Sequence, residues 1–198
     1  MYARLITVRG ATKIDETVDF IRESTVPDLR QQKGFESINL AGNHAAGIFT
    51  VLTIWQTEAD RDSSEGFSEK ARTEALNILG GELTVDHLEE VVRETGSTPP
   101  TTGAKLHVRS IKMDPAEVDG NLAVFKDTVL PDMKATPGFM AARQMINRAT
   151  GEGRVGTVWA DESSLDAALQ KAEDRRAVAN SRGVQFGEDL RLEILFRG

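Results

Sequence analysis

Two kinds of apolar periodicity alternate along the chain, and the same succession of segments occurs twice. Stretches rich in aliphatic residues at 2–9 and 105–113 predict short strands. In the segments near 13–24 and 116–127, apolar residues recur at steps of three and four, as on one face of a helix. In each copy a Gly-Phe pair then begins a second strand, and a hairpin leads to a third strand that ends in Trp.

A second helix and a closing strand complete each copy. The helices are expected near 60–79 and 163–180, and the closing strands at 83–92 and 187–197. The order strand-helix-strand-strand-helix-strand is that of the ferredoxin-like split βαβ unit. The predicted fold class is therefore α+β, with two ferredoxin-like units.

An internal duplication relates the two copies, with an offset of 104 residues. The matching segments are Val26-Pro27-Asp28-Leu29 with Leu130-Pro131-Asp132-Met133, Gly34-Phe35 with Gly138-Phe139, and Val51-Leu52-Thr53-Ile54-Trp55 with Val155-Gly156-Thr157-Val158-Trp159. Only the opening strands need a shift of one residue. A proline inside a helix removes a hydrogen bond, so Pro27 and Pro131 should each end the first helix and begin a short extra turn.

The duplication also predicts the domains. A first unit covers 1–95, a linker rich in Pro, Gly and Thr covers 96–103, and a second unit covers 104–198. A four-stranded sheet with both helices on one side leaves its other face uncovered. We expect the other copy to cover that face, so that the two sheets pack against each other. The chain is then a monomeric pseudo-dimer, and a further homodimer is left open.

These motifs resemble the antibiotic biosynthesis monooxygenase family, which belongs to the dimeric α/β-barrel superfamily. The resemblance rests on the Pro-Asp-Leu/Met segment, the Gly-Phe pair, the hairpin and the strand ending in Trp with an acidic residue three positions later. It implies that this chain is an intrachain dimeric α/β barrel. The family includes cofactor-independent monooxygenases of polycyclic phenols and heme-degrading enzymes. In its catalytic members, the Trp that Trp55 and Trp159 match helps to wall the substrate cavity.

The resemblance does not extend to a heme site. The heme-degrading branch places an Asn on the first strand and a His on the second helix. Here the matching strand positions hold Thr7 and Ser110, and neither second helix contains a His. The absence of Cys excludes thiolate metal sites and Cys nucleophiles, and three His are too few for a His-rich metal centre. We therefore expect no cofactor and no metal.

Charge and hydropathy narrow the range of partners. The chain has 31 Asp and Glu against 24 Lys and Arg, a net charge of −7 without a basic tract, so no nucleic-acid partner is expected. No apolar run approaches the roughly 20 residues that span a bilayer, and no signal-peptide pattern is visible. We expect no membrane association and a cytoplasmic location, and a small-molecule ligand is left as the partner to consider.

The two Trp residues are the first candidates for a site. Trp55 and Trp159 either fill the core between sheet and helices or bind substrate by stacking on a flat aromatic ligand. By contrast, Glu173 and Arg176 are three residues apart on a second helix. We expect them to form a solvated salt bridge.

Charged residues on the first and closing strands are the second set of candidates. Strand alternation places Arg4, His107 and Arg109 on one sheet face, and each closing strand, with His87 or Arg191, neighbours a first strand. These residues form either a compensated ion-pair network or a polar-lined cavity. In the second interpretation His87 or His107 is the catalytic proton acceptor, and Arg4, Arg109 and Arg191 bind the substrate. The sequence leaves open which sheet face meets the helices.

Two functions fit these features. The first is a cofactor-independent monooxygenase, or a related oxidoreductase, that acts on a small hydrophobic or aromatic substrate. The second is a non-catalytic barrel that binds a small ligand or serves as an interaction module. An open pocket of roughly 300 Å³ or more beside a Trp favours the enzyme, and a filled interior favours the second function.

Overall fold

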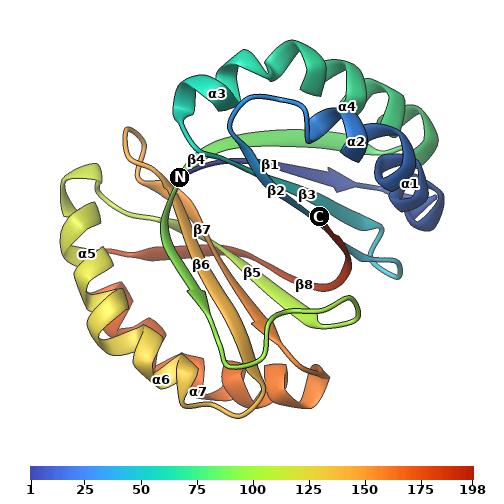
Figure 1. Ribbon diagram of the computed structural model, residues 1–198. Coiled ribbons are helices and arrows are strands. Elements are labelled where there is room, and N and C mark those ends of the chain that lie inside the picture. The colour runs from blue at the N-terminus through green and yellow to red at the C-terminus, as the bar shows by residue number, and fades with distance from the viewer. The chain divides into compact units, whose positions relative to one another are not determined.

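The first copy of the repeat folds in the predicted order in the computed structural model (Figure 1). Its single amphipathic helix is a succession of three short helical segments, and its second helix is split in two. The elements are β1 (Tyr2–Arg9), α1 (Ile14–Phe20), the π-helical turn η1 (Ile21–Thr25), α2 (Val26–Leu29), β2 (Phe35–Asn43), β3 (Ile48–Trp55), α3 (Glu58–Ser63), α4 (Glu65–Leu79) and β4 (Glu82–Thr95).

The second copy repeats this order, but a short additional turn precedes its first helix and its second helix is unbroken. Its elements are β5 (Lys105–Lys112), the 3₁₀ turn η2 (Pro115–Glu117), α5 (Val118–Val124), the π-helical turn η3 (Phe125–Val129), α6 (Leu130–Lys134), β6 (Phe139–Asn147), β7 (Glu152–Trp159), α7 (Glu162–Ser181) and β8 (Gln185–Arg197). Asp114 caps the turn η2 that precedes α5, and its carboxylate accepts a hydrogen bond from the Ala116 amide at 2.9 Å.

The structure describes the backbone of residues 1–198 and every side chain except those of Asp174 and Arg175. Contacts divide the chain into two units, the first half (Met1–Leu88 with Leu192–Gly198) and the second half (Glu89–Arg191). The closing strands β4 and β8 therefore each supply residues to both halves. The boundaries 1–95, 96–103 and 104–198 concern the duplicated segments and stay a prediction.

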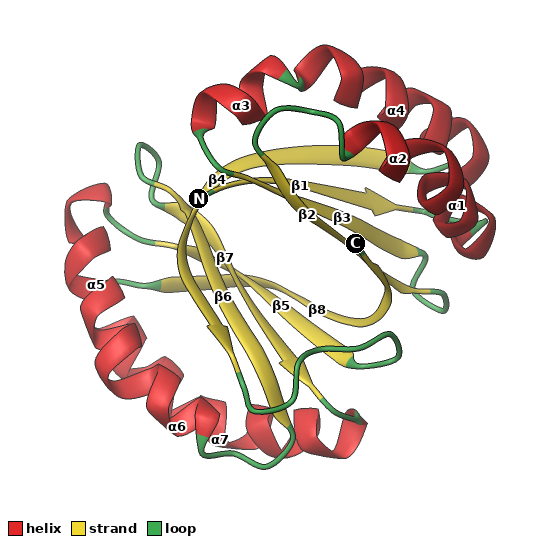
Figure 2. Ribbon diagram, in the orientation of Figure 1, coloured by secondary structure: helices red, strands yellow, loops and turns green.

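Each half contains an antiparallel sheet that is covered on one face by its helices (Figure 2). The strand order is β4-β1-β3-β2-β8 in the first half and β8-β5-β7-β6-β4 in the second. The first and closing strands are neighbours, as predicted. The expected class is thus confirmed: the fold is α+β, with two ferredoxin-like units of the dimeric α/β-barrel type.

The prolines do not interrupt the helices as predicted. Pro27 lies in the first turn of α2, but the chain enters α2 through η1 without a loop. The Val26 amide donates to the Ile21 carbonyl, five residues earlier, and this wider turn precedes a residue that has no amide hydrogen to donate. Pro131 follows η3 in the same manner. The expected extra turns exist, but a π-helical turn replaces the expected break.

Helix α7 covers the sheet of the second half and contributes Arg176 to the space between helix and sheet. Asp161 begins it, because its carboxylate accepts a hydrogen bond from the Ser164 amide at 2.8 Å. The helix extends over 20 residues.

Within the described part of the chain, no helix is both long enough and apolar enough to cross a membrane.

Candidate functional site

The two copies share an aromatic scaffold between sheet and helices. Trp55 and Trp159 are buried at the ends of β3 and β7, with 0% and 2% of their surface exposed. Each indole stands edge-on to the Phe of the Gly-Phe pair, with ring centroids 5.6 Å apart. Each indole N–H donates to the Thr two residues earlier, at 3.0 Å to Thr53 and 2.9 Å to Thr157. Both Trp residues are therefore packed between sheet and helices, and Trp159 also lines a cavity.

Arg4 occupies the position beside this scaffold in the first half. It lies opposite Thr53 in the β1–β3 register and has 1% of its surface exposed. Its guanidinium donates to the hydroxyls of Ser64 at 3.1 Å and Ser68 at 2.6 Å, and to the Arg61 carbonyl at 2.6 Å. It also pairs with Glu65 at 2.7 Å. A buried guanidinium with this set of partners is part of the folded core.

The remaining space in the first half is small. A cavity of about 70 Å³ lies between the sheet and the helices, and Arg4 and Arg72 contribute to its wall. Arg72 donates to Glu65 at 2.5 Å, so this carboxylate joins the two cations. Burial opposes ionisation of Glu65, but the hydrogen bond from Arg72 and the charge of Arg4 lower its pKa below the ordinary value. The first half therefore holds an ion-pair network in which two guanidiniums share one carboxylate.

His107 occupies the position of Arg4 in the second half. It lies opposite Thr157 in the β5–β7 register, as Arg4 lies opposite Thr53. Its Nε2 is 2.5 Å from a carboxylate oxygen of Asp189 on β8. The other oxygen of Asp189 accepts a hydrogen bond from Arg109. One carboxylate thus orients both the imidazole and the guanidinium.

A larger cavity of about 140 Å³ lies beside His107. The helix residues that hold Arg4 in the first half have apolar counterparts in the second, because Ala168, Leu169 and Ala172 stand where the first copy has Ser64, Glu65 and Ser68. With a smaller side chain on the strand and an apolar surface on the helix, the space is not filled by a polar network. The two halves therefore share the aromatic scaffold, but the first encloses a polar network and the second encloses a larger, mainly apolar cavity.

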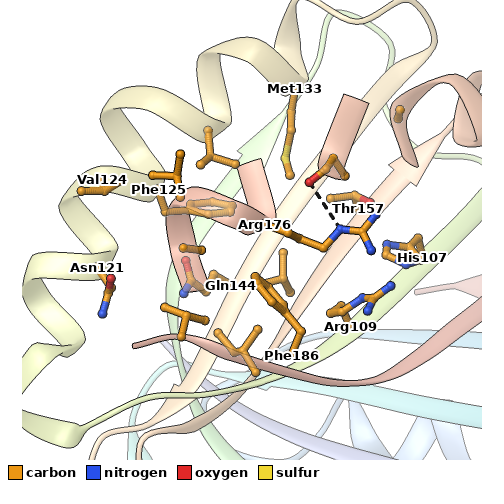
Figure 3. Close-up of a pocket in the computed structure, with 18 of the residues that line it drawn as sticks. His107, Arg109, Asn121, Val124, Phe125, Met133, Gln144, Thr157, Arg176 and Phe186 are labelled. Atoms are coloured by element: carbon orange, nitrogen blue, oxygen red, sulfur yellow. Dashed lines mark hydrogen bonds between the residues drawn. The ribbon is translucent and has the colours of Figure 1, made fainter. Parts of the chain in front are cut away.

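The cavity in the second half is mainly apolar with polar groups at a few points (Figure 3). Phe125 and Phe186 line it together with Trp159. Two amide side chains also line it, and each has a buried atom without a hydrogen-bond partner among the described residues: Oε1 of Gln144 and Nδ2 of Asn121. Buried polar atoms in proteins usually have a partner, so these two atoms can bind a ligand.

His107 is suited to accept a proton. Burial lowers its pKa below the ordinary value, and the charges of Arg109 and Arg191 act in the same direction, although Asp189 opposes them. The ring is therefore neutral near pH 7. A neutral ring that donates its Nε2–H to Asp189 keeps Nδ1 unprotonated, so one nitrogen remains available as an acceptor.

The depressed pKa of His107 predicts how stability depends on pH. The unfolded chain binds a proton at His107 more readily than the folded protein does, so this residue makes the free energy of unfolding decrease as the pH falls from about 7 to 5. Replacing His107 by Gln removes this contribution. Urea denaturation of both proteins across this range should give a shallower decrease for His107→Gln, and parallel curves would show that His107 is not held neutral.

The structure distributes the predicted site residues between the two halves. In the second half His107, Arg109 and Trp159 line one cavity. Arg191 has 48% of its side chain exposed and pairs with Glu162 and Asp166 on α7, and it is not part of the cavity wall.

The other candidates lie in the first half. Arg4 lines the smaller cavity, and its guanidinium carbon is 5.7 Å from the centre of the Trp55 ring. His87 is 41% exposed and lies 3.8 Å from Glu65. The alternation of Arg4, His107 and Arg109 is as expected, and the face that they share is the one that the helices cover.

Sequence reasoning missed four residues of the site in the second half: Asp189, Arg176, Gln144 and Asn121. Arg176 does not form the predicted solvated bridge, because its side chain enters the cavity and donates to two carbonyl oxygens of its own helix. The alignment of the two copies could have indicated this role of Arg176. Its counterpart Arg72 pairs with Glu65 in the first half, but the second copy has Leu169 at the position of Glu65.

The described side chains include no group of three or more His, Asp or Glu placed to hold a metal ion. The candidate site consists instead of one imidazole-carboxylate pair, a set of Arg side chains and two amides around an apolar space.

Comparison with models of known protein families gives no match. Two similar proteins come from Mycobacterium tuberculosis. The chain is 23% identical over 192 residues to the uncharacterized protein Rv2557, which covers 96% of this chain and 84% of that protein. It is 24% identical over 197 residues to the uncharacterized protein Rv2558, covering 98% of this chain and 80% of that protein. Both relationships extend over nearly the whole chain, so both copies of the repeat are included.

Solved structures show the same fold at low sequence identity. An anthrone oxidase-like protein has a TM-score of 0.68 and 13% identity, with 100% of this chain and 92% of that chain covered. A ferredoxin-fold protein related to antibiotic biosynthesis monooxygenases, from Listeria monocytogenes, has a TM-score of 0.56 and 10% identity, covering 98% and 95%. A heme-degrading enzyme from the same organism has a TM-score of 0.55 and 9% identity, covering 99% and 100%. The chain therefore shares its fold with these proteins, one of which is related to antibiotic biosynthesis monooxygenases.

Proposed function

We propose that the second half contains a cofactor-independent monooxygenase site for a small, electron-rich aromatic compound. The observation that carries the proposal is a neutral imidazole, oriented by a carboxylate, beside an apolar cavity that Trp159 lines. The fold shared with an anthrone oxidase-like protein supports the same chemistry. The similarity to a heme-degrading enzyme supports a small-molecule ligand in general.

The volume of the cavity limits the size of the substrate. An engineered cavity of about 150 Å³ in another protein binds benzene. The cavity here, at about 140 Å³, is therefore suited to one aromatic ring rather than to a polycyclic system. Phe125 and Phe186 provide apolar surface for such a ring.

The reaction follows from the pairing of a base with an oxidisable ring. His107 accepts the proton of a phenolic hydroxyl, and the resulting phenolate supplies electrons to dioxygen, so that a carbon–oxygen bond forms. The O–O bond then breaks. One oxygen atom remains on the ring as a carbonyl, and the other leaves as water together with two hydrogens from the substrate. A dihydroxybenzene and O₂ thus give a hydroxyquinone and water, with all four electrons supplied by the substrate.

Each residue of the site has a separate role in this scheme. Asp189 positions His107 and keeps its second nitrogen free of a proton. Arg109 shares Asp189 and lines the cavity, so we assign it to substrate binding together with Trp159. We assign Arg4 a structural role.

Oxygen uptake tests the proposal. The full chain, treated with a chelator, is mixed with dihydroxybenzenes, and uptake is measured with an oxygen electrode against a protein-free blank. We expect protein-dependent uptake with one O₂ consumed for each quinone formed. Single-ring substrates should be preferred to three-ring phenols. The proposal is wrong if no dihydroxybenzene gives uptake above the blank.

A second candidate function is ligand binding without catalysis. The observation in its favour is the volume of the cavity, which is below the roughly 300 Å³ typical of small-molecule sites. In this case single-ring phenols should raise the unfolding temperature, because a ligand stabilises the folded protein that it binds, but should consume no oxygen. The two measurements together separate the two functions.

A further inference from the structure

The cavity in the second half has an excess of positive charge on its wall. Arg176 extends from α7 into the cavity, towards the side where His107 and Arg109 lie (Figure 3). Its Nε donates to the Ala172 carbonyl at 3.3 Å, and its Nη2 donates to the Leu169 carbonyl at 3.4 Å. Both acceptors are neutral and both bonds are long. Among the side chains that the structure describes, no carboxylate pairs with this guanidinium.

In the first half, the equivalent arginine has a carboxylate partner. Arg72, the counterpart of Arg176, donates to Glu65 at 2.5 Å, and Glu65 also pairs with Arg4. Leu169 occupies the position of Glu65 in the second copy. Helix α7 has therefore kept the cation and lost the side chain that neutralises it.

The other charged groups that face the cavity do not neutralise the positive charge of Arg176. Asp189 is a carboxylate beside the site, and it already accepts hydrogen bonds from Arg109 and His107. Arg182 donates to the neutral side chain of Asn121 at 3.2 Å. A cation beside an apolar cavity is costly unless an anion accompanies it.

The unpartnered amides point to a ligand independently of the charges. Gln144 is 4% exposed and Asn121 is 8% exposed, and both line the cavity. Oε1 of Gln144 lacks a donor, and Nδ2 of Asn121 lacks an acceptor, among the described residues. At the equivalent positions the first copy has Leu40 and Thr17, which leave no such atoms unpaired there. The unpartnered amide atoms therefore belong to the larger cavity, whereas the unpartnered buried atoms beside the smaller cavity are nitrogens of two guanidiniums, Nε of Arg4 and Nη1 of Arg72.

We propose that the ligand of this cavity is a small aromatic acid, with its carboxylate on Arg176. A guanidinium can hold a carboxylate through two parallel hydrogen bonds. The ring then lies against Phe125 and Phe186, and a ring hydroxyl can donate to Gln144. This inference rests on the proposed function, because it names the substrate class of the same site.

Binding of benzoate and benzamide to the full chain tests the inference, since the two probes have similar shape and differ in charge at pH 7. Isothermal titration should show tighter binding of benzoate. Replacing Arg176 by Gln should weaken benzoate binding about tenfold or more, because a charged hydrogen bond is lost, and should change benzamide binding less than about twofold. Lys126→Gln removes an exposed charge from the same half and should change neither affinity.

A second variant keeps the test valid if Arg176→Gln unfolds. Leu169→Glu restores the carboxylate that the first copy has at this position, so it should neutralise Arg176 and weaken benzoate selectively. Benzoate binding that is no tighter than benzamide binding, or that is unchanged in both variants, would overturn the acid as the ligand. The proposed function is judged separately, by oxygen uptake with uncharged dihydroxybenzenes.

Discussion

Replacing Arg4 by Ala should lower the free energy of unfolding by about 3–5 kcal/mol. Arg4 is almost completely buried, and its guanidinium binds Ser64, Ser68, the Arg61 carbonyl and Glu65. Its removal leaves these acceptors without their donor and creates a cavity beside the sheet. Chemical denaturation of the two proteins measures the difference.

His107→Ala is the matched control, because His107 occupies the equivalent position in the second copy. Its partner Asp189 keeps the hydrogen bond from Arg109, so this carboxylate does not lose every donor. We expect a loss below about 2 kcal/mol, in the ordinary range for a single substitution. Equal losses for the two variants would mean that the two positions do not differ in the way that their contacts indicate.

The second large effect is on the reaction. Replacing His107 by Ala should lower the rate of oxygen uptake by about 10²–10⁴-fold, the usual contribution of a positioned proton acceptor. The fold should remain intact, which thermal unfolding can verify.

His87→Ala is the control for the reaction, because His87 is the other His that the sequence singles out as a proton acceptor. Burial and the charges of Arg61 and Arg4 lower the pKa of His87 also, so its protonation does not distinguish it from His107. Its location does. It lies in the first half, near Glu65, and it does not line the larger cavity. The rate should therefore change less than about twofold.

Much of the fold can be predicted from the sequence because each strand and helix occurs in both copies, so two sequence segments indicate the same element. The strands at 2–9 and 105–113 match β1 and β5 within one residue. Alternation along these strands places Arg4 and His107 on the same face correctly. The helices were harder to predict, since a proline can follow a π-helical turn as well as a break, and Pro27 and Pro131 do so.

The site was less predictable because it depends on contacts between distant segments. Asp189 lies 82 residues from His107, and nothing local to either residue indicates that they meet. Arg176 is three residues from Glu173, the spacing of a salt bridge on a helix surface. Its side chain points into the cavity because of the way the helix packs against the sheet, which this spacing does not reveal. The differences between the two copies indicate where the site lies, whereas their similarities indicate only the fold. The clearest example is Leu169, which stands in the second copy where the first copy has Glu65.

The pH dependence of oxygen uptake by the wild-type protein and by His107→Ala shows whether a neutral His107 in the second half takes the proton from the substrate. The wild-type rate should rise as the pH increases through the lowered pKa of His107 and then level off. The rate of His107→Ala should be at least about a hundredfold lower and should lack this rise. A variant that retains both the rate and the pH profile of the wild-type protein would contradict the account.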